Sequence, residues 1–324
     1  MTFKVGIIGA GIIGGAFTWG FNEFEETEVV AICDLDPWKT NALANEFHIE
    51  HTYTDHKEML KRDDIDIIYI GVPPKHHKSI FLDSIKSGKH VLVEKPIALN
   101  YQEGKQMMDA AKNSSCITAI DLIFRYNLAV KKLKELISSD HIGTIRRLQL
   151  TFRFPIWPRD WQQVNWLKER IQGGPLREVG SHFFFLLTEL FGSVKRLSSL
   201  VEYSGPDCYE NGVVGTIEME SGLVCTLDLL ADVPELQENT LTIHGEKETI
   251  SFTDWSKLNR LTKDGVWEFF YEDKGNATQE IIREFIQAIR GEDHDLVALK
   301  TGVYTQQILD AIISSNGEWV YFNK

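Results

Sequence analysis

The chain has 324 residues, of which 43% are hydrophobic and 25% charged, with a formal net charge of -13. This length suggests two domains, and the composition is that of a soluble globular protein with a full core. The negative charge argues against nucleic-acid binding, which needs basic patches, and no apolar run is long enough for a membrane span.

The N-terminal forty residues have the order of a dinucleotide-binding unit: strand, glycine-rich turn, helix, strand and acid. Two apolar runs, residues 3–8 and 29–33, flank a turn and helix that begin with Gly9, Gly11 and Gly14. The first glycine permits a tight turn, the second lets the backbone approach a pyrophosphate, and the third lets the helix pack against the strands. The helix N-terminus then offers N–H groups and partial positive charge to the phosphates.

Asp34 follows the second apolar run and lies 20 residues after Gly14. This matches the spacing of about 20 residues at which an acid accepts the ribose hydroxyls of a bound adenosine. A carboxylate at this position also repels a 2′-phosphate, so we expect NAD as cofactor rather than NADP. The alternative is a doubly wound fold that has lost its ligand.

The alternation of helices and strands continues to about residue 122. Helical patterns cover 40–47, 56–62, 77–87 and 101–113, and apolar, β-branched strands cover 65–70, 90–93 and 116–120. Such continuous apolar runs are typical of buried parallel strands. We therefore expect residues 1–122 to form an α/β Rossmann domain.

Two of these strand ends carry candidate site residues. Val72 and Pro73 turn the chain over the sheet edge where such folds bind ligands, and His77 opens the next helix. A histidine there reaches a nicotinamide ribose or is an ordinary surface residue. Lys95 ends the strand 90–93, where burial lowers the pKa of an amine and suits it to proton transfer. Many strands, however, simply end in lysine.

With these motifs, the chain resembles the Gfo/Idh/MocA oxidoreductases, the glucose–fructose oxidoreductase and inositol dehydrogenase family. The matching stretches are the glycine turn, residues 73–77, residues 88–96 with Glu94-Lys95-Pro96, and Phe124-Arg125-Tyr126-Asn127. The resemblance implies that Lys95 is catalytic, that Glu94 helps shape the cofactor site and that the bond before Pro96 is often cis. The residues expected at the cofactor are Gly9, Gly11, Ile12, Ile13, Gly14, Asp34, Val72, Pro73, His77, Glu94 and Lys95.

A helical pattern over 128–138 links to residues that favour strands in succession. Candidate strands cover 146–154, 194–204, 213–220, 223–230, 240–245, 248–252, 257–262, 266–271 and 319–322, and helices cover 278–290 and 296–314. We expect residues 123–324 to form an α+β domain with a large, mainly antiparallel open sheet. The resemblance implies that one sheet face pairs subunits, giving a homodimer or homotetramer.

Glu178 and His182 stand four residues apart in the segment that interrupts these strands. On a helix they share a face, and a carboxylate beside a histidine fixes its tautomer and makes it a better base. The same spacing is also typical of a surface contact. The resemblance implies that His182 accepts a proton with Glu178 as partner. Inositol dehydrogenases usually have Asp at the position of Glu178, and an Asp is frequent where Phe185 stands, so an inositol substrate is not favoured.

Two further side chains are candidates for substrate binding beside Lys95 and His182. Trp161 belongs either to a hydrophobic core or subunit interface, or to a loop over the site, where its indole stacks on a sugar. Arg125 holds a substrate hydroxyl or carboxylate, or forms an interdomain salt bridge. The four cysteines have neither CxxC nor metal-ligand spacing, so we expect reduced thiols, a cytoplasmic protein and no metal.

The sequence thus predicts an NAD(P)-dependent oxidoreductase that moves a hydride between nicotinamide and a hydroxyl carbon of a sugar, polyol or derivative. The competing hypothesis is a non-catalytic, NAD- or sugar-sensing regulator on the same fold. A family regulator of that kind lacks the lysine of the Glu-Lys-Pro motif. Lys95 and His182 are both present here, which favours an enzyme.

Overall fold

The computed structural model describes residues 2–162 and 164–322, and the chain divides into two compact units. Unit 1 runs to Ile123 and resumes over Asn276–Gln306, and unit 2 takes Phe124–Gly275 and the residues from Gln307 onward. The sequence prediction placed everything after residue 122 in the second domain. The contacts within the chain instead assign residues 276–306 to unit 1.

Unit 1 is built on a six-stranded sheet with the order β3-β2-β1-β4-β5-β6. Its strands are β1 (Phe3–Ile8), β2 (Thr27–Cys33), β3 (His51–Tyr53), β4 (Ile67–Ile70), β5 (His90–Val93) and β6 (Thr118–Ile120). All neighbouring strands are parallel. This is the strand order of a Rossmann sheet, so the predicted α/β domain is confirmed. The short edge strand β3 was not predicted.

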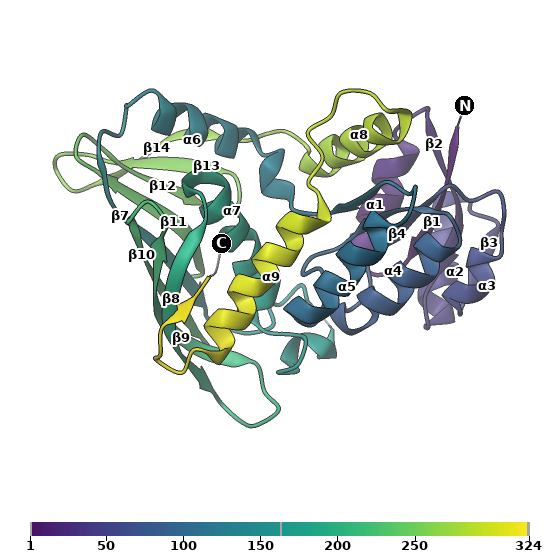
Figure 1. Ribbon diagram of the computed structural model, residues 1–324, viewed down its shortest axis with the longest axis horizontal. Coiled ribbons are helices and arrows are strands. Elements are labelled where there is room, and N and C mark those ends of the chain that lie inside the picture. The colour runs from purple at the N-terminus through teal and green to yellow at the C-terminus, as the bar shows by residue number, and fades with distance from the viewer. Residues whose placement is uncertain (1, 163, 323–324) are drawn as a thin grey trace. The chain divides into compact units, whose positions relative to one another are not determined.

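Helices flank this sheet, as Figure 1 shows for α1, α4 and α5. The helices of unit 1 are α1 (Ile12–Asn22), α2 (Pro37–Phe47), α3 (His56–Leu60), α4 (His77–Lys86), α5 (Tyr101–Lys112), α8 (Ala277–Arg290) and the first part of α9 (Leu299–Ser314), with a 3-10 turn at Pro74–His76. Helix α2 begins three residues earlier than expected because Asp36 caps it, accepting from the backbone N–H of Trp38.

Helix α8 joins unit 1 by packing against α1. A Cβ added to Gly20 of α1 would lie 2.8 Å from Cδ1 of Ile282, so the missing side chain permits this contact. The face that α8 buries contains Ile281, Ile282 and Phe285, all fully buried. Burial of such side chains is worth about 1.5–3 kcal/mol each, which explains why residues distant in sequence join the first unit.

Unit 2 contains a nine-stranded sheet with the order β14-β13-β12-β11-β7-β10-β9-β8-β15. Its strands are β7 (Ile145–Phe154), β8 (Val194–Tyr203), β9 (Glu210–Met219), β10 (Val224–Ala231), β11 (Glu238–Gly245), β12 (Thr249–Thr253), β13 (Lys257–Leu261), β14 (Trp267–Glu272) and β15 (Val320–Tyr321). Strands β7 and β10 pair in parallel and the other neighbours are antiparallel. The predicted mainly antiparallel sheet is confirmed.

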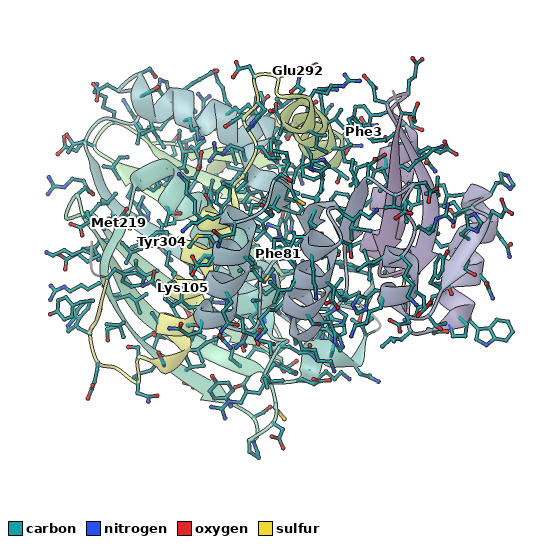
Figure 2. The ribbon with its side chains drawn as sticks, turned by 45° about the vertical axis from the view of Figure 1, so that its right-hand side comes forward. Phe3, Phe81, Lys105, Met219, Glu292 and Tyr304 are labelled. Atoms are coloured by element: carbon teal, nitrogen blue, oxygen red, sulfur yellow. The ribbon has the colours of Figure 1, made fainter. Side chains whose placement is uncertain are left out.

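One helix covers part of this sheet with an apolar core. The helical elements of unit 2 are the 3-10 turn Ile123–Arg125 from Phe124 on, α6 (Leu128–Ser138), a 3-10 turn at Asn165–Lys168, a π-helix at Leu176–Gly180, α7 (Ser181–Phe191) and the end of α9. Phe183 of α7 meets Phe152 of β7 edge-on, with ring centroids 5.1 Å apart. Phe81 of α4 and Met219 of β9, labelled in Figure 2, are fully buried in their respective units. Among the described residues, no helix is both long and apolar enough to cross a membrane.

Candidate functional site

The glycine turn between β1 and α1 combines two close contacts with one open position. A Cβ on Gly9 would lie 2.2 Å from the carbonyl oxygen of Gly71, and a Cβ on Gly14 would lie 1.8 Å from that of Gly9. A Cβ on Gly11 would meet no heavy atom of the described residues within 4 Å. Packing therefore requires Gly9 and Gly14, whereas Gly11 keeps space open at the start of α1, as a bound pyrophosphate needs.

The first turn of α1 is suited to an anion. Ile12 and Ile13 are 65% and 43% exposed, and the first turn contains no acidic side chain. The partial positive charge of the helix N-terminus is therefore not compensated from within the helix. This electrostatic feature favours a phosphate group at the turn.

Asp34 is held beside the turn by two backbone groups. Its Oδ2 accepts a hydrogen bond from the N–H of Ala10 and its Oδ1 accepts one from the N–H of Asp36, each at 2.9 Å. These bonds fix the carboxylate while leaving each oxygen further acceptor capacity. The geometry fits the predicted contact with ribose hydroxyls.

His77 is placed differently from the prediction. Its ring is fully buried, with Nδ1 2.9 Å from the carbonyl oxygen of Pro96 and Nε2 2.7 Å from that of Val72. Burial lowers the pKa of His77, and the two carbonyls oppose this effect. Both ring nitrogens already face backbone oxygens, so we no longer expect His77 to reach a ribose hydroxyl. The ring instead joins the turn at Val72 and Pro73 to the segment after β5.

The end of β5 places Glu94 and Lys95 at the carboxyl edge of the sheet. The bond between Lys95 and Pro96 is cis, as the resemblance suggested. Glu94 is buried, and its Oε1 accepts from the Tyr69 hydroxyl at 2.8 Å while its Oε2 accepts from the Lys95 N–H at 3.1 Å. Lys95 itself is half-buried. This edge therefore pairs an ordered carboxyl with a lysine that solvent reaches in part.

In unit 2, a π-helix carries Glu178 directly before α7. Such wide turns occur often at functional sites. The Glu178 Oε1 accepts from Nε2 of Gln162 at 2.8 Å and lies 3.6 Å from Nη2 of Arg159. Arg159 also donates to Oε1 of Gln162 at 2.8 Å. These contacts hold the carboxylate from the preceding loop, and the expectation that Glu178 orients His182 stays a prediction.

His182 lies in an aromatic setting near the start of α7. Its exposed fraction is 5%, and its ring centroid is 5.5 Å from that of Phe124 and 5.2 Å from that of Trp255. Asn127 donates from Nδ2 to the carbonyl oxygen of Trp255 at 2.9 Å, which holds the loop that carries the indole. His182 is therefore a positioned and largely buried imidazole, suited to selective proton transfer.

The two other substrate candidates have different surroundings. Trp161 is 52% exposed, and the guanidinium carbon of Arg159 lies 4.7 Å from its ring centroid. This placement excludes a core role for the indole and agrees with a surface loop. Arg125 donates from Nη2 to Oε2 of Glu189 at 2.8 Å, and Lys134 binds the other oxygen of Glu189. This salt bridge joins two residues of unit 2, and both alternatives for Arg125, a substrate contact or an interdomain bridge, stay predictions.

Several side chains at these sites were missed from the sequence. They are Tyr69, Asp121, Arg159, Gln162 and Trp255. Tyr69 and Asp121 have a detectable signal, because both stand at or next to the carboxyl end of an apolar strand, where polar residues line ligand sites. The other three have none, because they approach Glu178 or His182 from loops whose course depends on tertiary packing.

Comparisons with known proteins agree with this geometry. Residues 3–122 match the family described as "Oxidoreductase family, NAD-binding Rossmann fold", and residues 130–251 match the "GFO/IDH/MocA C-terminal domain". The protein is therefore of the class of NAD-binding oxidoreductases. This class is defined by the Rossmann sheet, its glycine turn and the family match over residues 3–122. The two matches together cover most of the chain, which belongs to the Gfo/Idh/MocA family.

Individual relatives are distant in sequence. The chain is 25% identical over 287 residues to trans-1,2-dihydrobenzene-1,2-diol dehydrogenase of Sus scrofa, covering 83% of this chain and 80% of the relative. Levoglucosan dehydrogenase in complex with NADH is similar in fold, with a TM-score of 0.86, 21% identity and coverage of 100% of both chains. An oxidoreductase of Desulfitobacterium hafniense described as NADPH-dependent gives a TM-score of 0.86 at 18% identity, covering 99% of this chain and 98% of its own.

Proposed function

We propose that this protein is an NAD-dependent dehydrogenase or reductase that acts on a hydroxyl carbon of a sugar, a polyol or a close derivative. The observation that carries the proposal is the carboxyl edge of the Rossmann sheet. One unit contains both Lys95 and a glycine turn whose open space fits a dinucleotide. The names of the levoglucosan and dihydrodiol dehydrogenases support a substrate with a CH–OH group. The cytoplasmic location and the homodimer or homotetramer stay predictions.

The proposal keeps the roles that the sequence predicts for Lys95 and His182. His182 accepts the hydroxyl proton, and the Lys95 ammonium stabilises the developing alkoxide. Glu178 orients His182, and Trp161 and Arg125 contact the substrate. The N-terminus of helix α1 would hold the pyrophosphate of NAD and Asp34 its adenosine ribose, and the bound cofactor would supply the hydride acceptor.

Replacing Asp34 by serine is expected to shift cofactor preference toward NADP. Removing a carboxylate that repels the 2′-phosphate removes roughly 1–4 kcal/mol of like-charge interaction, so the ratio of NADP to NAD affinity rises at least about fivefold. The measurement is a fluorescence titration of both cofactors. Asp36→Ser is the matched control, because it removes the same charge two residues away while serine can still cap α2, so we expect cofactor preference to stay as in wild type. A wild-type protein that already prefers NADP would show that the role of Asp34 is misread.

The variant His182→Asn is expected to lower kcat about a hundredfold, the smaller end of the usual contribution from general acid–base catalysis. Asparagine keeps a polar group between Phe124 and Trp255 but does not take up a proton. NAD affinity, measured in parallel, stays at the wild-type value. A His182→Asn protein with unchanged turnover would remove His182 from the mechanism.

A substrate panel tests the proposed function directly. Purified protein is mixed with NAD and with monosaccharides, sugar acids, inositols and polyols, and the absorbance of reduced nicotinamide is followed. Turnover of one compound that disappears in Lys95→Ala establishes both enzyme and substrate class. NAD binding without turnover across the panel, including nucleotide sugars, would instead favour the sensing regulator.

A further inference from the structure

A buried pair of carboxyl groups lies behind Lys95 in unit 1. Asp121 follows β6 and Glu94 follows β5, and these strands pair in parallel with Val93 opposite Ile120, so the two buried side chains are neighbours across the strand pair. The N–H of Asp121 donates to the carbonyl oxygen of Val93 at 2.9 Å, which fixes this placement. Two neighbouring carboxyl groups shielded from water do not both ionise readily, so we expect the pair to hold a proton. The proposed mechanism does not use this proton.

The surrounding donors show which carboxyl holds the proton. Glu94 already accepts from the Tyr69 hydroxyl at Oε1 and from the Lys95 N–H at Oε2. Oδ1 of Asp121, in contrast, is buried and has no hydrogen-bond partner among the described residues. Burying an ionised carboxylate whose oxygen lacks a hydrogen-bond partner has a large unfavourable free energy. Burying a protonated carboxyl group that donates to Glu94 has a much smaller one. The negative charge therefore belongs on Glu94.

The other titratable groups facing the pair are Tyr69, His77 and Lys95. Burial raises the pKa of Tyr69 and lowers that of His77, although the carbonyl oxygens at both ring nitrogens of His77 oppose the second effect. Burial, and then the charge of Glu94, raise the pKa of Asp121, while Lys95 opposes both. Lys95 is thus the cation that this pair faces.

We propose that Asp121 is a positioning residue that stays protonated at working pH and donates to Glu94, so that the buried pair presents one negative charge to Lys95 rather than two. Two charges would hold the ammonium strongly and disfavour proton exchange, whereas a single charge stabilises the ammonium less and leaves it able to exchange its proton. The catalytic part of this inference rests on the proposed role of Lys95. The protonation of Asp121 does not.

Infrared spectroscopy tests the protonation without requiring turnover. At pH 8, where ordinary carboxyl groups are ionised, the wild-type spectrum minus that of Asp121→Asn is expected to contain the C=O stretch of one protonated carboxylic acid. Asp66→Asn is the control, because Asp66 accepts from the backbone N–H of Lys4 and its bond needs no shared proton. A difference spectrum without that band overturns the proposal, even if no substrate is ever found.

The pH dependence of kcat/KM tests the effect on Lys95. Asparagine keeps a donor for Glu94 and leaves the charge unchanged, so Asp121→Asn is expected within about threefold of wild type with the same pH midpoint. Asp121→Ala leaves Glu94 without this donor and is expected about tenfold lower. If Asp121 is ionised, Asp121→Asn removes a negative charge and the pH midpoint falls, which contradicts the proposal. The infrared result stands whether or not the alanine variant folds.

Discussion

The variant Lys95→Ala is expected to lower kcat about a thousandfold or more while NAD affinity changes little. Lys95 is assigned both the stabilisation of the alkoxide and part of the proton transfer, and each such contribution is typically about a hundredfold or more. We expect NAD affinity to be preserved because the glycine turn and Asp34, which we propose bind the far end of the cofactor, are untouched. Turnover is measured on the compound that the panel identifies, and affinity by fluorescence titration.

The matched control for this variant is Lys86→Ala. Lys86 is exposed in the last turn of α4, so its loss removes the same charge from the same unit without touching the sheet edge. It is expected to match wild type in turnover and in affinity. Equal activity of Lys95→Ala and wild type would contradict the proposed mechanism. A loss of NAD binding would show that Lys95 acts mainly by binding the cofactor.

Three alanine variants in the glycine turn are expected to separate folding from cofactor binding. Gly14→Ala places a Cβ 1.8 Å from the carbonyl oxygen of Gly9, so the turn must shift. We expect a loss of about 3 kcal/mol in the free energy of unfolding, the upper end for overpacking, and no measurable NAD binding. Chemical denaturation and cofactor titration measure the two effects.

The neighbouring glycines supply the controls. A Cβ on Gly15 would lie 3.5 Å from Leu43, an ordinary contact, so Gly15→Ala should gain about 0.5–1 kcal/mol from helix propensity and still bind NAD. Gly11→Ala has no neighbour to strain and should fold like wild type, yet its Cβ occupies the space assigned to the pyrophosphate. Wild-type NAD affinity in Gly11→Ala would contradict the assignment of the turn as the dinucleotide site.

The features predicted correctly from the sequence are those that depend on local pattern. Apolar runs predicted the buried strands, and the glycine spacing with Asp34 predicted the turn between β1 and α1. The contacts in this turn join residues that the strand-turn-helix motif keeps in a fixed order along the chain. The edge strand β3 escaped prediction because its three residues contain no alternation long enough to detect.

The missed features depend on contacts between distant parts of the chain. The ring of His77 was expected at a nicotinamide ribose or at the surface. Its nitrogens instead face the carbonyl oxygens of Val72 and Pro96, which come together only when β5 lies beside β4. The partners of Glu178 come from a loop 16 or more residues earlier, and Trp255 approaches His182 from a turn after β12. No periodicity in the sequence marks such encounters.

The division of the chain limits how its parts can be recombined. The backbone crosses between the units after Ile123, after Gly275 and after Gln306, the last crossing lying inside α9. A fragment ending at Ile123 would lack α8, and the apolar surface of α1 around Gly20 would meet water instead of Ile282. A self-sufficient nucleotide-binding module therefore cannot be excised as one continuous segment. Engineering that exchanges substrate specificity by domain grafting must therefore transplant residues 124–275 together with those from Gln307 onward, while residues 276–306 stay with unit 1.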